Sequence, residues 1–195
     1  MGVTAGDERA ALATAAAASA VQLVLERCRA ARTRVVAIDG PSGSGKSTLA
    51  DALVQAWPGH APELVRLDDV YPGWEGLESA GAALAHELVA RHARGAVGTW
   101  RRWDWAADRV GSIEQSRPGR ALIVEGCGAF AATSSVEAVA IWVEASPRVR
   151  KRRALERDAG AFDPYWDLWE RQWRRYVART APARRADARV RVAGV

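Results

Sequence analysis

A glycine-rich segment near residue 40 constrains this chain more than any other feature. Gly40 and Gly45 stand five residues apart and a Lys-Ser pair follows directly, which fits the Gly-x4-Gly-Lys-Ser/Thr pattern of phosphate-binding loops. Glycines let the backbone amides turn inward around an anion, because no Cβ is in the way. The pattern requires a strand before the loop and a helix after it. Both are expected here, over residues 34–39 and 46–57.

The amides of this loop and the N-terminus of the following helix attract phosphate groups. Lys46 is expected to reach the β- and γ-phosphates, and the Ser47 hydroxyl is expected to ligate Mg²⁺. The sequence contains no asparagine, so the Asn-Lys-x-Asp guanine reader of GTPases is absent. ATP with Mg²⁺ is therefore the expected ligand. The residues expected to bind the nucleotide are Gly40, Ser42, Gly43, Ser44, Gly45, Lys46, Ser47 and Thr48.

Apolar strands alternate with helices along the rest of the chain. Strands are expected over residues 34–39, 64–67, 120–124, 139–143 and 189–192, and helices over residues 46–57, 77–94, 147–158 and 165–179. This alternation predicts a three-layer α/β/α fold with a mostly parallel five-stranded sheet. Residues 99–108, rich in Trp, Arg and Asp, give no clear pattern. Without a linker or a repeat, the 195 residues are expected to form one domain, residues 1–195.

The first 32 residues are expected to form an N-terminal helix. Residues 10–25 carry no charge, but two acidic residues and a single arginine precede them, so the basic region of a secretory signal is missing. The uncharged run is also too short to cross a bilayer. Larger apolar side chains recur at helical spacing, at Val21, Val24, Leu25 and Cys28. We therefore expect a helix that packs on the domain, no membrane partner and, from two distant cysteines, a cytoplasmic location.

Acidic residues follow two of the expected strands. Asp68 and Asp69 come after the second strand, at the sheet edge where open α/β sheets bind ligands. Phosphoryl transfer to an alcohol needs a carboxylate that accepts the hydroxyl proton, and Asp68 is the favoured residue. Glu125 ends another apolar strand. Ser47, Asp68 and Glu125 are the expected Mg²⁺ ligands. The alternative for the aspartates is a solvated turn.

Together these segments resemble the ordered landmarks of the uridine kinase-like group of P-loop nucleoside and small-molecule kinases. The matching segments are residues 37–47, Asp68-Asp69-Val70-Tyr71, Trp103-Asp104-Trp105 and residues 123–126. The resemblance covers roughly residues 35–187 and implies a nucleoside/nucleotide-kinase-like fold, Asp68 as base and an acid near Mg²⁺. The sequence has Val70 where the group commonly has Phe, Trp103 where Tyr is common, and Asp108 where a His is frequent.

An arginine-rich helix follows the fourth expected strand. Arg150, Arg153 and Arg157 are spaced i, i+3, i+7 and share one face. In the resemblance this helix belongs to an Arg-rich lid over residues 150–165 that closes on the phosphates. Arginines there would neutralise the charge of the transferring phosphoryl group, so Arg153 or Arg157 is expected to be catalytic, together with Lys46 and Asp68. The alternative is a solvated basic face.

Tryptophan is unusually frequent, with nine residues. Trp166, Trp169 and Trp173 form a stripe that is simplest to read as core. The tryptophans near the expected acceptor site, Trp105 among them, serve either to hold a flat ring or to pack. The residues expected to contact the acceptor are Asp68, Asp69, Tyr71, Trp74, Trp103, Asp104 and Arg109.

The predicted function is ATP-dependent transfer of a γ-phosphate to a hydroxyl of a nucleoside or similar small molecule. The alternatives are a P-loop ATPase or nucleotide-binding regulatory module, and a kinase for a non-nucleoside metabolite or an antibiotic. The formal charge is +5, but all except two of the 28 basic residues are arginine and they are mixed with 23 acids. A nucleic-acid partner is therefore not expected, since a phosphorylated ligand explains the excess as well. The oligomeric state is open.

Overall fold

The computed structural model describes residues 5–158 and 160–192, with side chains described from residue 17 onwards. A parallel sheet lies at its centre, with the strand order β2-β5-β1-β6-β7. The strands are β1 (Val35–Asp39), β2 (Glu63–Arg66), β5 (Leu122–Glu125), β6 (Val139–Glu144) and β7 (Ala188–Arg191). Every neighbouring pair in this sheet is parallel. The predicted α/β class and the five-stranded sheet are confirmed.

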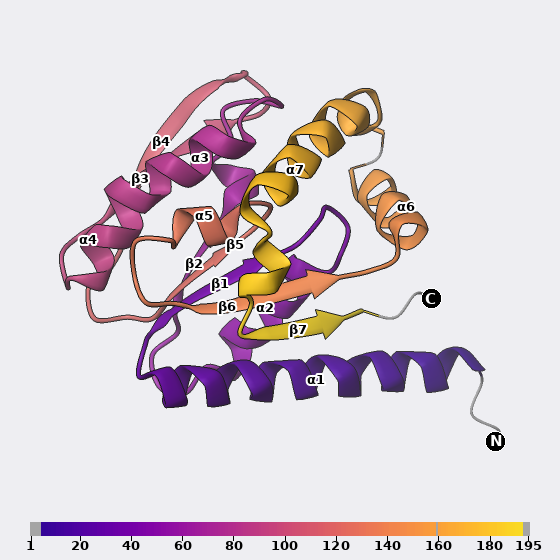
Figure 1. The fold of residues 1–195 in the computed structure, drawn as a ribbon, viewed down its shortest axis with the longest axis horizontal. Helices are drawn as coiled ribbons and strands as arrows, with labels where there is room; N and C mark the ends of the chain where they lie inside the picture. Colours follow the sequence, from indigo (N-terminus) through magenta and orange to yellow (C-terminus); the bar gives the residue numbers. More distant parts are fainter. Residues whose placement is uncertain (1–4, 159, 193–195) are drawn as a thin grey trace.

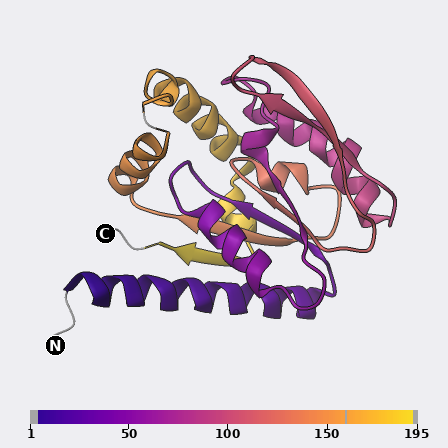
Figure 2. The same ribbon diagram turned by 180° about the vertical axis from the view of Figure 1, so that it is seen from behind.

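Helices cover both faces of the sheet (Figure 1), as the buried residues of each strand require. Successive side chains of a strand point to opposite faces, so Val36 and Ile38 pack in one core and Val35 and Ala37 in the other. The first core contains α1 (Ala5–Ala31) and α2 (Lys46–Ala56), which pack on the same face of the sheet and contact each other (Figure 2). The opposite face is covered by α3 (Leu77–Leu84), α5 (Ala129–Ala132) and α7 (Trp166–Thr180).

The N-terminal helix α1 ends one residue before the predicted boundary, and residues 1–4 of that prediction lie outside the described part. Val21, Val24, Leu25 and Cys28 are all buried against the sheet side, as their spacing predicts. Within the described residues, no helix has the length and apolar character needed to cross a membrane.

The predicted helix 77–94 is one helical segment with an irregular centre. After α3 the chain makes a π-helical turn, η2 (Ala85–Val89), and ends in α4 (Ala90–Ala93). The stretch without a clear pattern forms an antiparallel hairpin, β3 (Thr99–Asp104) and β4 (Arg109–Gln115), apart from the main sheet. Almost every residue of β4 is exposed, so its sequence carries no alternation that would reveal a strand.

The remaining elements place the functional segments. The short turn η1 (Leu67–Asp69) follows β2, and α6 (Pro147–Arg157) follows β6. After α6 the chain makes the turn η3 (Asp163–Tyr165), enters α7 and then forms η4 (Pro182–Arg185) before β7. Ala159, part of the predicted lid over residues 150–165, lies outside the described residues. The phosphate-binding loop, η1 and the segment after β5 all lie at the carboxyl edge of the sheet, where the sequence places the site.

Candidate active site

The phosphate-binding loop connects central strand β1 to helix α2 and is packed tightly against two neighbours. Gly40 and Gly43 have φ values of 150° and 74°. A Cβ added to Gly40 would lie 2.0 Å from the carbonyl oxygen of Val143, and one added to Gly43 would lie 1.9 Å from that of Arg150. No other residue fits at either position. Gly45 caps α2 without a side-chain hydrogen bond, so the first amides of that helix are left for an anion.

Lys46 lies almost fully buried within the loop. Its Nζ donates a hydrogen bond to the Pro41 carbonyl at 3.1 Å and lies 3.8 Å from Cys127 Sγ. Burial lowers the pKa of Lys46, but Cys127 and then the carboxylates of Glu125, Asp68 and Asp39 act in the opposite direction and leave the pKa raised. The lysine is therefore a fixed positive charge. Burial also raises the pKa of the Cys127 thiol, which keeps it neutral beside the loop.

Asp39, the last residue of β1, is a fully buried carboxylate that sequence reasoning did not assign to the site. Its Oδ1 accepts hydrogen bonds from the amides of Gly40 at 2.7 Å and Gly128 at 3.0 Å. Its Oδ2 accepts from the Phe130 amide at 3.0 Å and from the Tyr176 hydroxyl at 2.7 Å. Burial raises the pKa of Asp39 and the four hydrogen bonds oppose that shift. This side chain ties the phosphate-binding loop to the loop after β5 and to α7.

Glu125 lies at the end of β5 beside the first turn of α2. The Ser47 hydroxyl donates to its Oε1 at 3.0 Å. The parallel register of β2 and β5 pairs Glu125 with Arg66, whose Nε lies 3.5 Å from the same oxygen. Arg66 also forms an ion pair with Asp51. Burial raises the pKa of Glu125, although Lys46, Ser47 and Arg66 act in the opposite direction.

The predicted Mg²⁺ ligands are brought together only in part. Ser47 and Glu125 are in direct contact, and Ser47 lines one pocket with Asp68. The described residues contain no group of three or more His, Cys, Asp or Glu side chains arranged to hold a metal ion. A hydroxyl and a carboxylate nevertheless fit Mg²⁺, which prefers oxygen ligands and takes one or two from protein while phosphates and water supply the rest.

Asp68 and Asp69 have different environments. Asp68 is half exposed and its carboxylate lies 3.6 Å from the guanidinium of Arg157. Asp69 points elsewhere and pairs with Arg102 of β3 at 3.0 Å. The indole N–H of Trp105 donates to the backbone carbonyl of Asp68 at 2.8 Å, which holds this turn in place. The geometry therefore places Asp68, and not Asp69, against the pocket described next.

The three lid arginines lie in different environments. Arg157 lines the pocket and forms a bidentate pair with Asp158, which together with Asp68 raises the pKa of its guanidinium. Arg150 is buried, forms a bidentate pair with Glu170 of α7 and lies over the ring of Trp166. Arg150 thus joins α6 to α7. Arg153 does not line the pocket.

One pocket of about 760 Å³ joins the phosphate loop to the lid. Its polar lining includes Ser47, Asp68 and Arg157. Aromatic side chains also line it, and they come from the loop after η1, the hairpin turn, the segment after α6, and α7 itself. The aromatic lining residues are Tyr71, Trp74, Trp105, Phe162, Tyr165 and Trp169. Trp169, whose stripe the sequence suggested was core or a helix-packing surface, is both buried and part of the pocket wall.

The hairpin residues predicted to hold the acceptor lie outside this pocket. Asp104 Oδ1 accepts hydrogen bonds from the amides of Ala106 and Ala107 and so caps the hairpin turn. Arg109 is exposed and pairs with Asp104 in the β3–β4 ladder. Trp105, the residue next to Asp104, lines the pocket instead of these residues. Adjacent hairpin residues cannot be distinguished from their sequence, because their orientation depends on the type of the turn between β3 and β4.

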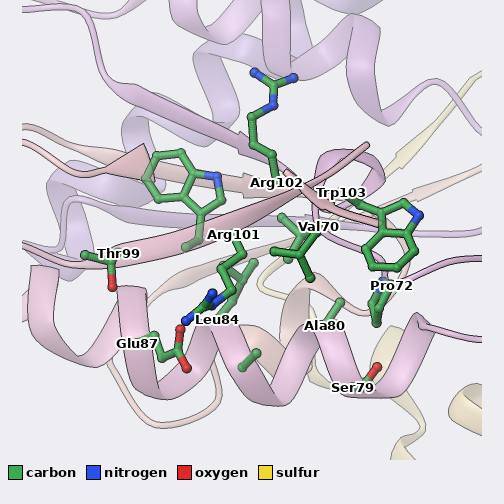
Figure 3. Close-up of a pocket in the computed structure, with 13 residues that line it drawn as sticks. Val70, Pro72, Ser79, Ala80, Leu84, Glu87, Thr99, Arg101, Arg102 and Trp103 are labelled. Atoms are coloured by element: carbon green, nitrogen blue, oxygen red, sulfur yellow. The ribbon is translucent and has the colours of Figure 1, made fainter. Parts of the chain in front are cut away.

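Trp103 lines a separate cleft of about 200 Å³ (Figure 3). One wall is β3, and the other is α3 with the π-helical turn, as the side chains of Ser79, Leu84 and Glu87 show. Val70 lies between them and contributes to the cleft. This cleft contains none of the residues that contact the phosphate loop.

The comparisons with known proteins support the fold. No family model matches the chain, and no curated protein matches it. Among solved structures, a possible uridine kinase from Bacillus stearothermophilus is 21% identical, with 80% of this chain and 86% of that chain covered and a TM-score of 0.55. A candidate fructose transport system kinase from Silicibacter sp. is 23% identical over 68% of this chain and 77% of that chain, with a TM-score of 0.46. The resemblance to the uridine kinase-like group is confirmed as a likeness of fold.

Proposed function

We propose that this protein is a kinase that transfers the γ-phosphate of ATP to a hydroxyl group of a small molecule. The observation that carries this proposal is that Ser47, Asp68 and Arg157 line one pocket. One pocket therefore brings the serine of the phosphate-binding loop, a carboxylate and an arginine together with an aromatic lining, which offers space for a second molecule. A simple nucleotide-binding module has no need of that second space.

Each charged residue has a role in this reaction. The loop amides and Lys46 bind the β- and γ-phosphates. Asp68 accepts the proton of the acceptor hydroxyl while the hydroxyl oxygen attacks the γ-phosphorus. The bond from that phosphorus to the oxygen bridging the β-phosphate breaks, and ADP leaves. The Arg157 guanidinium lies 3.6 Å from the Asp68 carboxylate, so it is placed to neutralise the oxygens of a phosphoryl group that is transferred beside this carboxylate.

Ser47 and Glu125 are the residues that would hold Mg²⁺. When bound, this ion would supply positive charge that stabilises the phosphate groups. The Ser47–Glu125 hydrogen bond at 3.0 Å keeps both oxygen atoms within reach of one site. Glu125 is buried and its pKa is raised, because burial disfavours the charged carboxylate. A bound cation would stabilise that charged form.

The test is ADP release by the full chain with ATP and Mg²⁺, with and without a panel of hydroxylated small molecules. Asp68→Asn should reduce acceptor-dependent turnover by about 10²- to 10⁴-fold, the usual range for a general base. Asp69→Asn is the matched control, since its carboxylate pairs with Arg102 and lies away from the pocket. It should retain turnover within a few-fold. Both variants should bind a non-hydrolysable ATP analogue normally.

Acceptor-independent hydrolysis of ATP that Asp68→Asn leaves unchanged would contradict the proposal. That result would favour the ATPase or regulatory alternative.

A further inference from the structure

The wall of the acceptor end of the pocket is built from stacked rings. Trp74 is the centre of this cluster. Its ring stacks on Tyr165 with centroids 4.4 Å apart and an interplanar angle of 8°, and on Phe162 at 5.2 Å and 14°. Trp105 tilts against it at 4.8 Å and 52°. Three separate segments of the chain thus converge on one aromatic surface, which we call the aromatic wall (Trp74, Trp105, Phe162 and Tyr165).

Two rings of the aromatic wall remain open to solvent. Trp105 and Tyr165 are each 39% exposed, whereas Phe162 is only 3% exposed. Large aromatic side chains that gather at a pocket without being covered commonly mark a ligand-binding surface. The faces available to a ligand therefore belong to Trp105 and Tyr165, with Trp74 as their support.

The polar groups around this space are largely committed to one another. Asp51 pairs with Arg66, and Arg157 pairs with both Asp158 and Asp68. The indole N–H of Trp105 is bound to the Asp68 carbonyl, and the hydroxyl of Tyr71 to the Cys127 carbonyl at 2.9 Å. Among the described residues that line the pocket, none is Asn, Gln or His. The side-chain amides and imidazoles that most often read a ring edge are therefore missing from this lining. Of its hydroxyls, which can both donate and accept, those of Ser47 and Tyr71 already donate to Glu125 and Cys127. The Tyr165 hydroxyl is the remaining one among the described lining residues, and Tyr165→Phe tests whether it reads the ligand.

On this basis, and resting on the proposed function, we propose that the acceptor is an alcohol with a planar ring body that is held by stacking and not read at its edges. Its hydroxyl points towards Asp68, and its ring lies on Trp105 and Tyr165. Stacking tolerates different rings because every flat ring has a π-face. Sites of this kind discriminate weakly among ring substituents, in contrast to sites that hydrogen-bond an edge. A broad range of ring alcohols should therefore bind with similar affinity.

The experiment measures binding to the full chain in the presence of a non-hydrolysable ATP analogue and Mg²⁺. The signal is the quenching of intrinsic tryptophan fluorescence, with thermal shift as a second readout. The probes are uridine, cytidine and inosine, which differ in their ring edges, 2-(1-naphthyl)ethanol, which has a ring without polar edges, and ribose, which has hydroxyls and no planar ring. The four ring alcohols should have dissociation constants within about fivefold, and ribose should bind at least about tenfold more weakly, consistent with the stacking energy of one ring.

Matched variants separate stacking from the packing of the lid segment. Tyr165→Phe keeps the ring, and Tyr165→Leu keeps an apolar side chain of similar length without a π-face. The Phe variant should retain the affinity for ring alcohols, while the Leu variant should lose it by about fivefold or more. If the two variants bind ring alcohols equally, Tyr165 only packs and the inference is overturned.

The remaining outcomes distinguish this inference from the proposed function. Ring alcohols that bind but are never phosphorylated would uphold the stacking site and refute the kinase. Phosphorylation of ribose in preference to every ring alcohol would uphold the kinase and refute the stacking site. A preference of more than about fiftyfold for one nucleoside over the other two, or no binding of any ring alcohol at millimolar concentration, would also refute the stacking site.

Discussion

Substituting Asp39 with asparagine tests whether this buried carboxylate organises the site. The two oxygen atoms accept four hydrogen bonds, three from backbone amides and one from the Tyr176 hydroxyl. An asparagine has one acceptor oxygen, and its amino group must face the other pair of donors. The least costly orientation directs the amino group to Phe130 and Tyr176, because the hydroxyl can rotate and accept. The Phe130 amide is then left buried without an acceptor.

The cost of this change follows from the number of hydrogen bonds. One orphaned buried amide costs about 1–3 kcal/mol. The remaining hydrogen bonds lose their charge assistance, which roughly halves their strength. Removing a poorly solvated charge offsets part of this loss, since burial raises the pKa of Asp39. We expect Asp39→Asn to lower the free energy of unfolding by about 2–4 kcal/mol, and Tyr176→Phe to lower it by about 1 kcal/mol.

The measurement is equilibrium unfolding in urea followed by tryptophan fluorescence and circular dichroism. Asp108→Asn is the control, because Asp108 is exposed and its φ of 48° suits asparagine. It should change the free energy of unfolding by less than about 0.5 kcal/mol. The two changes at Asp39 and Tyr176 should also be non-additive, because they remove the same hydrogen bond. An Asp39→Asn variant as stable as the parent would refute the assignment of this carboxylate as an organising residue.

Three further predictions follow from the site. The folded-state pKa of Glu125 is raised, so its contribution to stability is full below the ordinary glutamate range and is lost as the pH rises through the raised value. Glu125→Gln should therefore have a melting temperature near pH 7 that matches or exceeds that of the parent. The same variant should lose Mg²⁺-dependent ATP binding in calorimetry. Gly43→Ala should weaken binding of an ATP analogue by at least about tenfold because its Cβ meets the Arg150 carbonyl, whereas Gly59→Ala, with a φ of 79° and open space around it, should leave that affinity unchanged. Arg157→Gln should lower kcat by about 10²- to 10³-fold with a much smaller change in the KM for ATP. A rise in this KM as large as the fall in kcat would contradict a role in the transition state.

The sequence predicted the central sheet and the donor side of the site because both depend on local patterns. Four of the five residues of β1 are apolar and all five are buried, so an uninterrupted apolar run marks a central parallel strand. The phosphate loop is equally local, since its glycines, lysine and serine are adjacent in the chain. Glu125 was predictable for the same reason, as the acid that closes the apolar strand β5.

The acceptor side depends on contacts between distant segments and could not be predicted in the same way. Trp74, Trp105 and Tyr165 meet only when the hairpin and the lid segment have folded over η1. Neither strand of the hairpin has the alternation of a half-buried strand, since β4 is exposed along most of its length. The role of Asp39 was also hidden, because an acid at the end of a buried strand looks the same whether it faces solvent or three backbone amides.

Helix α7 connects the two halves of the site through two independent contacts. Tyr176 bonds to Asp39 and so reaches the start of the phosphate loop. One to two turns earlier in the helix, Glu170 holds the guanidinium of Arg150, whose backbone carbonyl packs against Gly43 at the tip of the same loop. The preceding residue, Trp169, lines the acceptor pocket. A displacement of α7 would therefore shift a wall of the pocket together with the start and the tip of the phosphate loop, so this helix sets the distance between that loop and the pocket.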